Sequence, residues 1–348
     1  MDFNTILIDW YSNNKRDFPW RKTNDPYFIW LSEIIMQQTQ TGQGLPYYEA
    51  FVSNFPTVKS LAEADESEVL KLWQGLGYYS RARNLHFSAK LIAEKLDGTF
   101  PNTFDDIIKL KGVGDYTASA IASICFDEPT AVVDGNVYRV LSRYFGIDTP
   151  INSTKGIKEF KSLATDLIDH NNPGDYNQAV MEFGATVCKP QNPLCAECPL
   201  CNGCIARKEN RISELPVKLK KTKVKTVYFN YLVFISSTKE TLFEQRKGKG
   251  IWRNLYQFPL VISSKQLSPK EFQKNEEVQS ILKDTPFEYS QYNEHPITHK
   301  LSHRTLITTF WIIEVDQLPQ SGIAIEDLPT FPAPVLIGNF LEAFDFGV

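Results

Sequence analysis

The chain lacks any long uninterrupted apolar stretch. No segment approaches the ~18–20 apolar residues that a membrane-spanning helix needs, although 42% of the 348 residues are hydrophobic. The first residues also lack the basic stretch and apolar centre of a secretory leader. Phe3, Leu7 and Trp10 instead recur at helical spacing, which predicts a first helix over residues 2–14. We therefore expect a cytoplasmic protein that makes no contact with a membrane.

An overall excess of basic residues is also absent. The formal net charge is −4, whereas a domain that binds nucleic acid usually carries a basic surface. Positive charge is concentrated in residues 207–225, which contain only two glutamates. The eight basic residues of this segment are Arg207, Lys208, Arg211, Lys218, Lys220, Lys221, Lys223 and Lys225. A solvated linker is the simpler interpretation of this segment. A segment that follows the phosphates of a nucleic acid is the alternative.

Cysteine is scarce outside one short segment. Five of the six cysteines lie within residues 188–204, at positions Cys188, Cys195, Cys198, Cys201 and Cys204. A cytosolic setting disfavours disulfides, so this density indicates metal binding. Both an iron–sulfur cluster and a four-thiolate zinc site fit the pattern. The spacing leaves the fourth ligand open between Cys201 and Cys204.

One expected helix carries a carboxylate on an apolar background. Residues 28–40 (FIWLSEIIMQQTQ) are apolar nearly all round, as in a buried helix, yet Glu33 lies in the middle. A carboxylate there must be paired, protonated or functional, because burying a bare charge is costly. Desolvation would raise its pKa from about 4.3 towards neutrality, which suits a general acid. A buried Glu that accepts from a backbone N–H or a water is the alternative.

Further helices are expected over residues 45–55, 66–74 and 80–96. Between the last two lies a glycine-rich loop, Gln74–Arg83, with the sequence QGLGYYSRAR. Its Leu, Tyr and Arg side chains suit a wedge that enters a base stack while holding phosphates. A plain helix C-cap followed by a new helix explains the glycines equally well.

A second glycine turn, Gly112-Val113-Gly114, separates helices expected over residues 104–109 and 115–126. Glycines let the backbone approach a phosphate, and the N–H groups that begin a helix attract it. A simple turn is the alternative. Asp134 follows soon after and precedes Gly135, a position typical of a helix N-cap. The helix start should also keep Asp134 ionised.

The composition changes along the rest of the chain. Helices are expected over residues 156–170 and 176–187, the second of which contains Glu182. Beyond the basic segment, residues 227–235, 241–246 and 305–315 are rich in β-branched and aromatic side chains and are predicted strands. They indicate a separate α+β domain.

Five groups of residues together resemble, in type and order, the helix-hairpin-helix DNA glycosylases that contain an iron–sulfur cluster. They are Trp30-Leu31-Ser32-Glu33 running into Gln37–Gln40, Gly75-Leu76-Gly77-Tyr78-Tyr79, Val113–Ala118, Asp134-Gly135-Asn136-Val137, and the C-x6-C-x2-C-x5-C set. The resemblance covers the first 205 residues. The whole chain is similar to the MutY-type adenine DNA glycosylases.

This resemblance implies a multidomain fold. An all-α helix-hairpin-helix glycosylase domain would span residues 1–206, with a [4Fe–4S] loop at 188–204. A basic linker (207–225) and an α+β Nudix-like domain for 8-oxoguanine recognition (226–348) would follow. The acidic box of Nudix hydrolases is missing, so no pyrophosphatase activity is expected. The family pattern assigns the cluster to Cys188, Cys195, Cys198 and Cys204, and leaves Cys201 spare.

The implied reaction is removal of adenine paired with 8-oxoguanine or guanine in double-stranded DNA, by a monomer that flips the base out of the helix. Glu33 would protonate the adenine, and Asp134 would stabilise the oxocarbenium ion of the sugar, with their pKa values pushed in opposite directions. Tyr116 stands where lyase relatives carry a Lys nucleophile, which implies a monofunctional enzyme. Tyr116 and Asn136 would orient Asp134.

The resemblance also implies DNA contacts. Arg21 and Glu182 would contact the flipped adenine, and Gly112 and Gly114 would hold phosphate. The residues expected at 8-oxoguanine are Gln38, Thr39, Leu76, Tyr78, Ser302 and His303. The family's Phe-Ser-His loop reads Leu301-Ser302-His303 in this chain, so Ser302 and His303 transfer more directly than Leu301.

Overall fold

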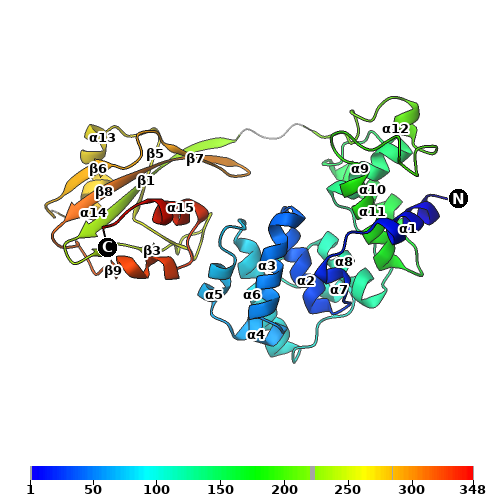
Figure 1. Cartoon of the computed structure of the whole chain (residues 1–348), viewed down its shortest axis with the longest axis horizontal. Helices are drawn as coiled ribbons and strands as arrows, with labels where there is room; N and C mark the ends of the chain where they lie inside the picture. Colours follow the sequence, from blue (N-terminus) through cyan, green and yellow to red (C-terminus); the bar gives the residue numbers. More distant parts are fainter. Residues whose placement is uncertain (1, 220–223, 284, 348) are drawn as a thin grey trace. The chain divides into compact units, whose positions relative to one another are not determined.

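The chain folds into two compact units in a computed structural model, which describes residues 2–219, 224–283 and 285–347 (Figure 1). The first unit comprises Met1–Glu63 and Asn84–Lys220, and the second comprises Ala64–Arg83 and Lys221–Val348. The segment Ala64–Arg83 thus belongs with a domain that the sequence placed entirely after residue 225. Among the described residues, no helix is both long and apolar enough to cross a membrane.

The first unit is helical. Its elements are α1 (Phe3–Asn14), a 3-10 turn (Pro19–Arg21), α2 (Pro26–Met36), α3 (Thr41–Asn54), α4 (Val58–Glu63), most of α6 (Ser80–Lys95), α7 (Phe104–Ile107), α8 (Asp115–Phe126), α9 (Gly135–Phe145), α10 (Thr154–Leu167), α11 (Pro173–Thr186) and α12 (Ile205–Lys208). Helices α1, α9, α10 and α11 pack around a shared core that includes Leu7, Val140, Phe160 and Phe183. This core holds the starts of α8 and α9 close to α11.

Two sequence predictions in this unit are wrong in detail. The helix expected over residues 28–40 ends at Met36, because Gln38 adopts a left-handed backbone with φ of 55°. The prediction also omitted the short helices α4 and α12. The remaining helices agree with the expected segments to within a few residues, which is the usual uncertainty of helix ends.

The basic segment expected as a free linker is largely packed on the first unit. The Arg143 guanidinium donates to the Leu215 carbonyl at 3.0 Å, and the Ile151 N–H donates to the Val217 carbonyl at 3.0 Å. Arg211 forms ion pairs within the same unit, including one with Asp148 at 3.4 Å. Lys220, Lys221 and Lys223 lie outside the described residues.

The second unit is built on one mixed sheet with strand order β5-β1-β8-β6, and β7 also pairs with β8. The long strands β1 (Lys225–Ser236) and β8 (Arg304–Val315) run parallel, from Lys225 beside Arg304 to Ser236 beside Val315. The other strands are β5 (Leu260–Ser263), β6 (Glu288–Gln291) and β7 (Ile297–Lys300). The strand expected over 241–246 is instead two short strands, β2 (Glu240–Thr241) and β3 (Glu244–Gln245), which pair with β9 (Ile323–Ala324) and β4 (Tyr256–Gln257).

Helices cover both faces of this sheet (Figure 1). On one face, α13 (Pro269–Gln273) and α14 (Glu276–Leu282) pack on the strands, and the ring of Phe272 stacks on Trp311 at 4.0 Å. On the other face, α15 (Val335–Ala343) places Phe340 against Phe310 at 4.1 Å. The short helix α5 (Glu66–Leu72) and the loop after it complete the unit.

Candidate active site

A cavity of about 210 Å³ in the first unit is lined by residues of α2, α8, α9 and α11. It is smaller than the ~300–1,000 Å³ of pockets that hold drug-sized ligands, so its size suits a single base. The sequence predicted seven of its lining residues: Arg21, Glu33, Thr39, Tyr116, Asp134, Asn136 and Glu182. Four of them were predicted as catalytic and two as adenine contacts. Thr39 was expected at 8-oxoguanine instead.

Glu33 faces this cavity from α2 and is otherwise surrounded by protein. Burial raises the pKa of Glu33 to about 7, and the nearby Asp134 carboxylate acts in the same direction. The adjacent Tyr116 side chain lowers that pKa but only partly offsets the burial, and the Tyr116 hydroxyl donates to Met181 Sδ at 3.2 Å. A carboxyl group with a pKa near neutrality exchanges protons readily at physiological pH, as a general acid requires.

Asp134 is the N-cap of α9, as predicted. One carboxylate oxygen accepts from the backbone N–H groups of Asn136 and Val137, both at 2.8 Å, and the other accepts from Asn136 Nδ2 at 2.7 Å. The predicted direction of its pKa is wrong, however. Burial raises the pKa of Asp134 above its usual value, and these donors, with Arg139, only partly offset that rise.

The two carboxyl groups therefore differ in their hydrogen bonds rather than in the direction of their pKa shifts. Asp134 accepts three hydrogen bonds from N–H donors, all of which favour its ionised form. Both pKa values are raised by burial, and the charge of Asp134 further disfavours ionisation of Glu33. A single proton shared by this pair is expected to reside mainly on Glu33.

Arg139 supports the candidate site through Asn136 and was not predicted from the sequence. Its Nη2 donates to Asn136 Oδ1 at 2.7 Å, which directs the NH₂ group of that amide to Asp134. The same guanidinium donates to the carbonyls of Gly184 and Cys188, both at 2.6 Å. Arg139 is only 8% exposed. The sequence signal was weak: Arg139 stands between Val137 and Val140, two apolar residues of α9, and a buried guanidinium needs several acceptors.

Glu182 does not present a free carboxylate to the cavity. It is 2% exposed and accepts from Arg16 Nε at 2.6 Å and from Arg21 Nη2 at 2.8 Å. Burial alone would raise the pKa of Glu182, but these two guanidinium groups outweigh it and hold the value at about 2. Glu182 thus anchors both arginines at the cavity wall. Arg16 was not predicted, although Glu182 within a helix signalled that a cation was needed.

The glycine turn before α8 has the geometry of an anion cradle. Gly112 has φ of 86°, and a Cβ there would lie 2.7 Å from Asn84 Cβ, so no other residue fits. Gly114 is the N-cap of α8, and a Cβ there would meet nothing within 4 Å. That open space leaves the first N–H groups of the helix accessible to an approaching phosphate.

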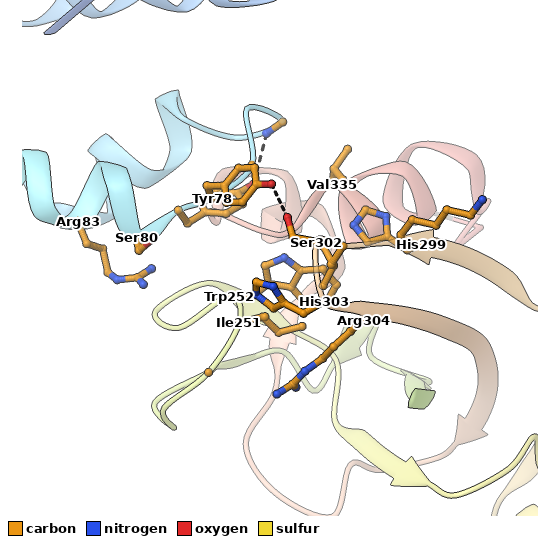
Figure 2. Close-up of a pocket in the computed structure, with 16 residues that line it drawn as sticks. Tyr78, Ser80, Arg83, Ile251, Trp252, His299, Ser302, His303, Arg304 and Val335 are labelled. Atoms are coloured by element: carbon orange, nitrogen blue, oxygen red, sulfur yellow. Dashed lines mark hydrogen bonds between the residues drawn. The ribbon is translucent and has the colours of Figure 1, made fainter. Parts of the chain in front are cut away.

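A second cavity, of about 430 Å³, lies within the second unit (Figure 2). The hydroxyls of Tyr78 and Ser302 are 2.6 Å apart, and His303 also lines the cavity. Figure 2 shows Tyr78 reaching towards Ser302 from the glycine-rich loop, with Trp252 nearby. Trp252 and His299, whose rings are 5.7 Å apart, were not predicted as site residues.

Other sequence predictions are not brought to this cavity. Leu76 is only 5% exposed and does not line it, so Tyr78, at 48% exposure, is the protruding residue of the loop. Gln38 is exposed and lines neither cavity. Arg81 is buried and donates to the carbonyls of Leu76 and Gly77 beneath the loop, so it does not offer the phosphate contact considered for it.

The cysteines of residues 188–204 line one small cavity beside Arg143. Burial raises the pKa of Cys198 to about 12, and the nearby thiols of Cys188, Cys204 and Cys195 contribute in the same direction. The Cys201 thiol instead contacts the Asn202 side-chain oxygen at 3.5 Å. In the described part of the chain, no three His, Cys, Asp or Glu side chains converge as a ligand set for one metal ion. The cavity nevertheless brings only sulfur donors together, which is the chemistry that an iron–sulfur cluster or a four-thiolate zinc site takes.

Comparisons with known proteins agree with this arrangement. Residues 31–164 match the family model of the HhH-GPD superfamily base excision DNA repair proteins, and residues 230–343 match the NUDIX domain. The chain is 38% identical over 258 residues to the adenine DNA glycosylase of Buchnera aphidicola subsp. Schizaphis graminum, covering 74% of each chain. It is 46% identical to the adenine DNA glycosylase of Rattus norvegicus, in an alignment that covers 62% of this chain and 44% of the relative.

A solved structure of a thermostable thymine-DNA glycosylase is also similar. The identity is 30% and the TM-score 0.55, over 60% of this chain and 95% of the other. The first unit has a helical fold with a hairpin and a cavity that holds two carboxyl groups. Together with the comparisons, these features define a base excision DNA glycosylase. The partner of such an enzyme is DNA. Within this class, the chain belongs to the adenine DNA glycosylase family, in which a helical domain is joined to a Nudix-like domain. Related glycosylases generally contain an iron–sulfur cluster.

Proposed function

We propose that this protein excises adenine paired with 8-oxoguanine or guanine in double-stranded DNA. The observation that carries the proposal is the pairing of Glu33, whose pKa is about 7, with the hydrogen-bonded carboxylate of Asp134 in one cavity. The family relationship supports adenine as the base removed. We also propose that the protein acts as a monomer on chromosomal DNA in the bacterial cytoplasm.

The chemistry follows from the two carboxyl groups. With adenine flipped into the cavity, Glu33 gives its proton to a ring nitrogen and makes the base a better leaving group. As the N-glycosidic bond breaks, positive charge develops on the sugar, and the Asp134 carboxylate stabilises it. Glu33, now ionised, takes a proton from the attacking water. Tyr116 lies beside Glu33 and cannot form the imine that a lysine would form.

The test is single-turnover cleavage of duplexes that contain adenine opposite 8-oxoguanine, guanine or thymine, with thymine opposite guanine as a fourth substrate. We expect adenine release from the first two duplexes only, with strand breaks appearing only after alkali. Release of thymine from the fourth duplex without release of adenine would instead favour the activity named for the structural relative. Strand cleavage without alkali would contradict the monofunctional assignment.

We propose that Cys188, Cys195, Cys198 and Cys204 hold a [4Fe–4S] cluster, which would order the loop that the Arg139 guanidinium contacts through the Cys188 carbonyl. The separate contact of Cys201 with Asn202 supports its exclusion from the ligand set. Cys201→Ser is expected to retain the iron content and the yellow-brown colour of the wild type. Cys204→Ser should lose both. Iron analysis and absorption spectra check this, and loss of iron in Cys201→Ser would reverse the assignment.

On the opposite strand, we propose that Tyr78, Ser302 and His303 contact 8-oxoguanine. Their common cavity supports this, because an aromatic ring can stack on a base while a hydroxyl reads its edge. Gly112 and Gly114 would bind a phosphate. The geometry gives less support to Gln38 and Leu76, which lie outside both cavities.

A further inference from the structure

The loop that carries Tyr78 is fastened to a part of the chain more than 250 residues later. The Lys71 ammonium group, at the end of α5, donates to the carbonyls of Pro329 and Phe331. These carbonyls lie at and just after the end of a 3-10 helix (Ile325–Thr330) that precedes α15. A lysine that donates to two backbone carbonyls is held in one place, unlike a solvated surface lysine.

Tyr79 makes a second attachment between the same two regions. Its hydroxyl donates to the Ala333 carbonyl at 3.2 Å and accepts from the Gly75 N–H at 3.3 Å. The Ala333 N–H in turn donates to Gln74 Oε1 at 3.2 Å. Tyr79 is buried, so these hydrogen bonds are shielded from water. The first glycine of the loop is thereby tied to the segment before α15.

The loop itself is held in an unusual backbone conformation. Gly75, Gly77 and Tyr78 have φ values of 96°, 75° and 47°, so three of four successive residues are left-handed. Trp73 Nε1 donates to the Gly77 carbonyl at 2.9 Å from beneath the loop. For a tyrosine, a positive φ is unfavourable and persists only where surrounding contacts enforce it. Its cost explains why the loop needs attachments on both sides.

We infer that Lys71 and Tyr79 are positioning residues that hold Tyr78 beside Ser302 and so set the preference for 8-oxoguanine over guanine. This inference rests on the proposed function. Tyr78 and Ser302 come from segments 224 residues apart, yet the attachments make them parts of one unit. Two groups that are already fixed relative to one another lose little further freedom on binding a lesion, so a loosened loop discriminates less.

Two substitutions remove the attachments and leave Tyr78, Ser302 and His303, the residues proposed to contact the lesion, unchanged; Tyr79 also lines the cavity, and phenylalanine keeps its ring there. Tyr79→Phe removes one hydroxyl, and Lys71→Met removes the ammonium group while keeping most of the aliphatic chain. Matched controls in the same unit are Tyr289→Phe, which loses a hydroxyl bound to the Pro269 carbonyl, and Lys239→Met, which loses an ammonium group bound to the Gly347 carbonyl. None of these four side chains contributes a catalytic group.

The first measurement is the ratio of single-turnover rates on duplexes with adenine opposite 8-oxoguanine and opposite guanine. Each substitution removes at least two hydrogen bonds, so in Tyr79→Phe and in Lys71→Met we expect this ratio to fall at least about fivefold, the factor that one hydrogen bond typically contributes. The rate opposite guanine should stay unchanged, which a general loss of folding would not produce. The two controls should keep the wild-type ratio.

The second measurement is hydrogen exchange of the amides in residues 74–80, which needs no substrate. Exchange should become faster in both variants, with no change in β1 or β8. Unchanged exchange would overturn the positioning role, and a loosened loop with an unchanged ratio would overturn the link to specificity. If the wild type releases no adenine, the proposed function fails, while the exchange data still decide whether Lys71 and Tyr79 hold the loop.

Discussion

Replacement of Glu33 by glutamine is expected to lower the single-turnover rate of adenine release by about 10²–10⁴-fold, the usual contribution of a general acid. Glutamine has nearly the same shape and keeps a polar group beside Tyr116. It has no acidic proton to give to the base. DNA binding should be preserved, because the changed group contacts only the flipped adenine.

The pH dependence of the wild type provides the internal control for this prediction. Glu33 acts as an acid only when protonated, and burial raises its pKa to about 7. The rate should therefore be high below pH 7 and fall as the pH rises through that value. This decline should be absent from the residual rate of Glu33→Gln. The melting temperature of the variant should not fall, since a neutral amide is less costly to bury than a carboxylate. A wild-type pH profile retained in Glu33→Gln would assign the titrating group to another residue.

Much of this site could be predicted because its signals are local. Asp134 caps the helix that begins one residue later, and Gly112 and Gly114 lie in the turn immediately before α8. Glu33 stands out because its own helix is apolar. Such features depend on residues close together in the chain, so they can be predicted from the sequence without the tertiary structure.

The predictions that failed depend on distant contacts. One partner of Glu182 is Arg16, 166 residues earlier, and no local pattern joins them. The pKa of Asp134 was expected to fall because an N-cap lowers it, but burial by other helices outweighs that effect. The segment Ala64–Arg83 was assigned to the first domain by its position in the chain. Its hydrogen bonds to residues 329–333 could not be read from either segment alone.

Asp134→Asn is expected to lower the rate of adenine release by about 10²–10³-fold, the cost of removing one group that stabilises charge in a transition state. The amide keeps the shape of the carboxylate and is itself a good N-cap, so α9 should retain its start. It carries no negative charge to oppose the positive charge that develops on the sugar. Chemical quench of single-turnover reactions on the adenine–8-oxoguanine duplex measures the loss.

The matched control is Asp25→Asn, because Asp25 caps α2 by accepting from the Tyr27 N–H at 2.9 Å and lies outside the cavity. Both variants lose one carboxylate at a helix start and keep an amide cap. Only the one at 134 should lose activity, and both should have melting temperatures close to that of the wild type. If Asp134→Asn kept full activity, or if the two variants lost activity equally, Asp134 would be only a helix cap. The two sites share the cap hydrogen bond to a backbone N–H, whereas Asp134 also accepts from Asn136 Nδ2. A selective loss at 134 with an unchanged melting temperature therefore assigns the effect to the carboxylate charge and its bond to Asn136, beyond helix capping.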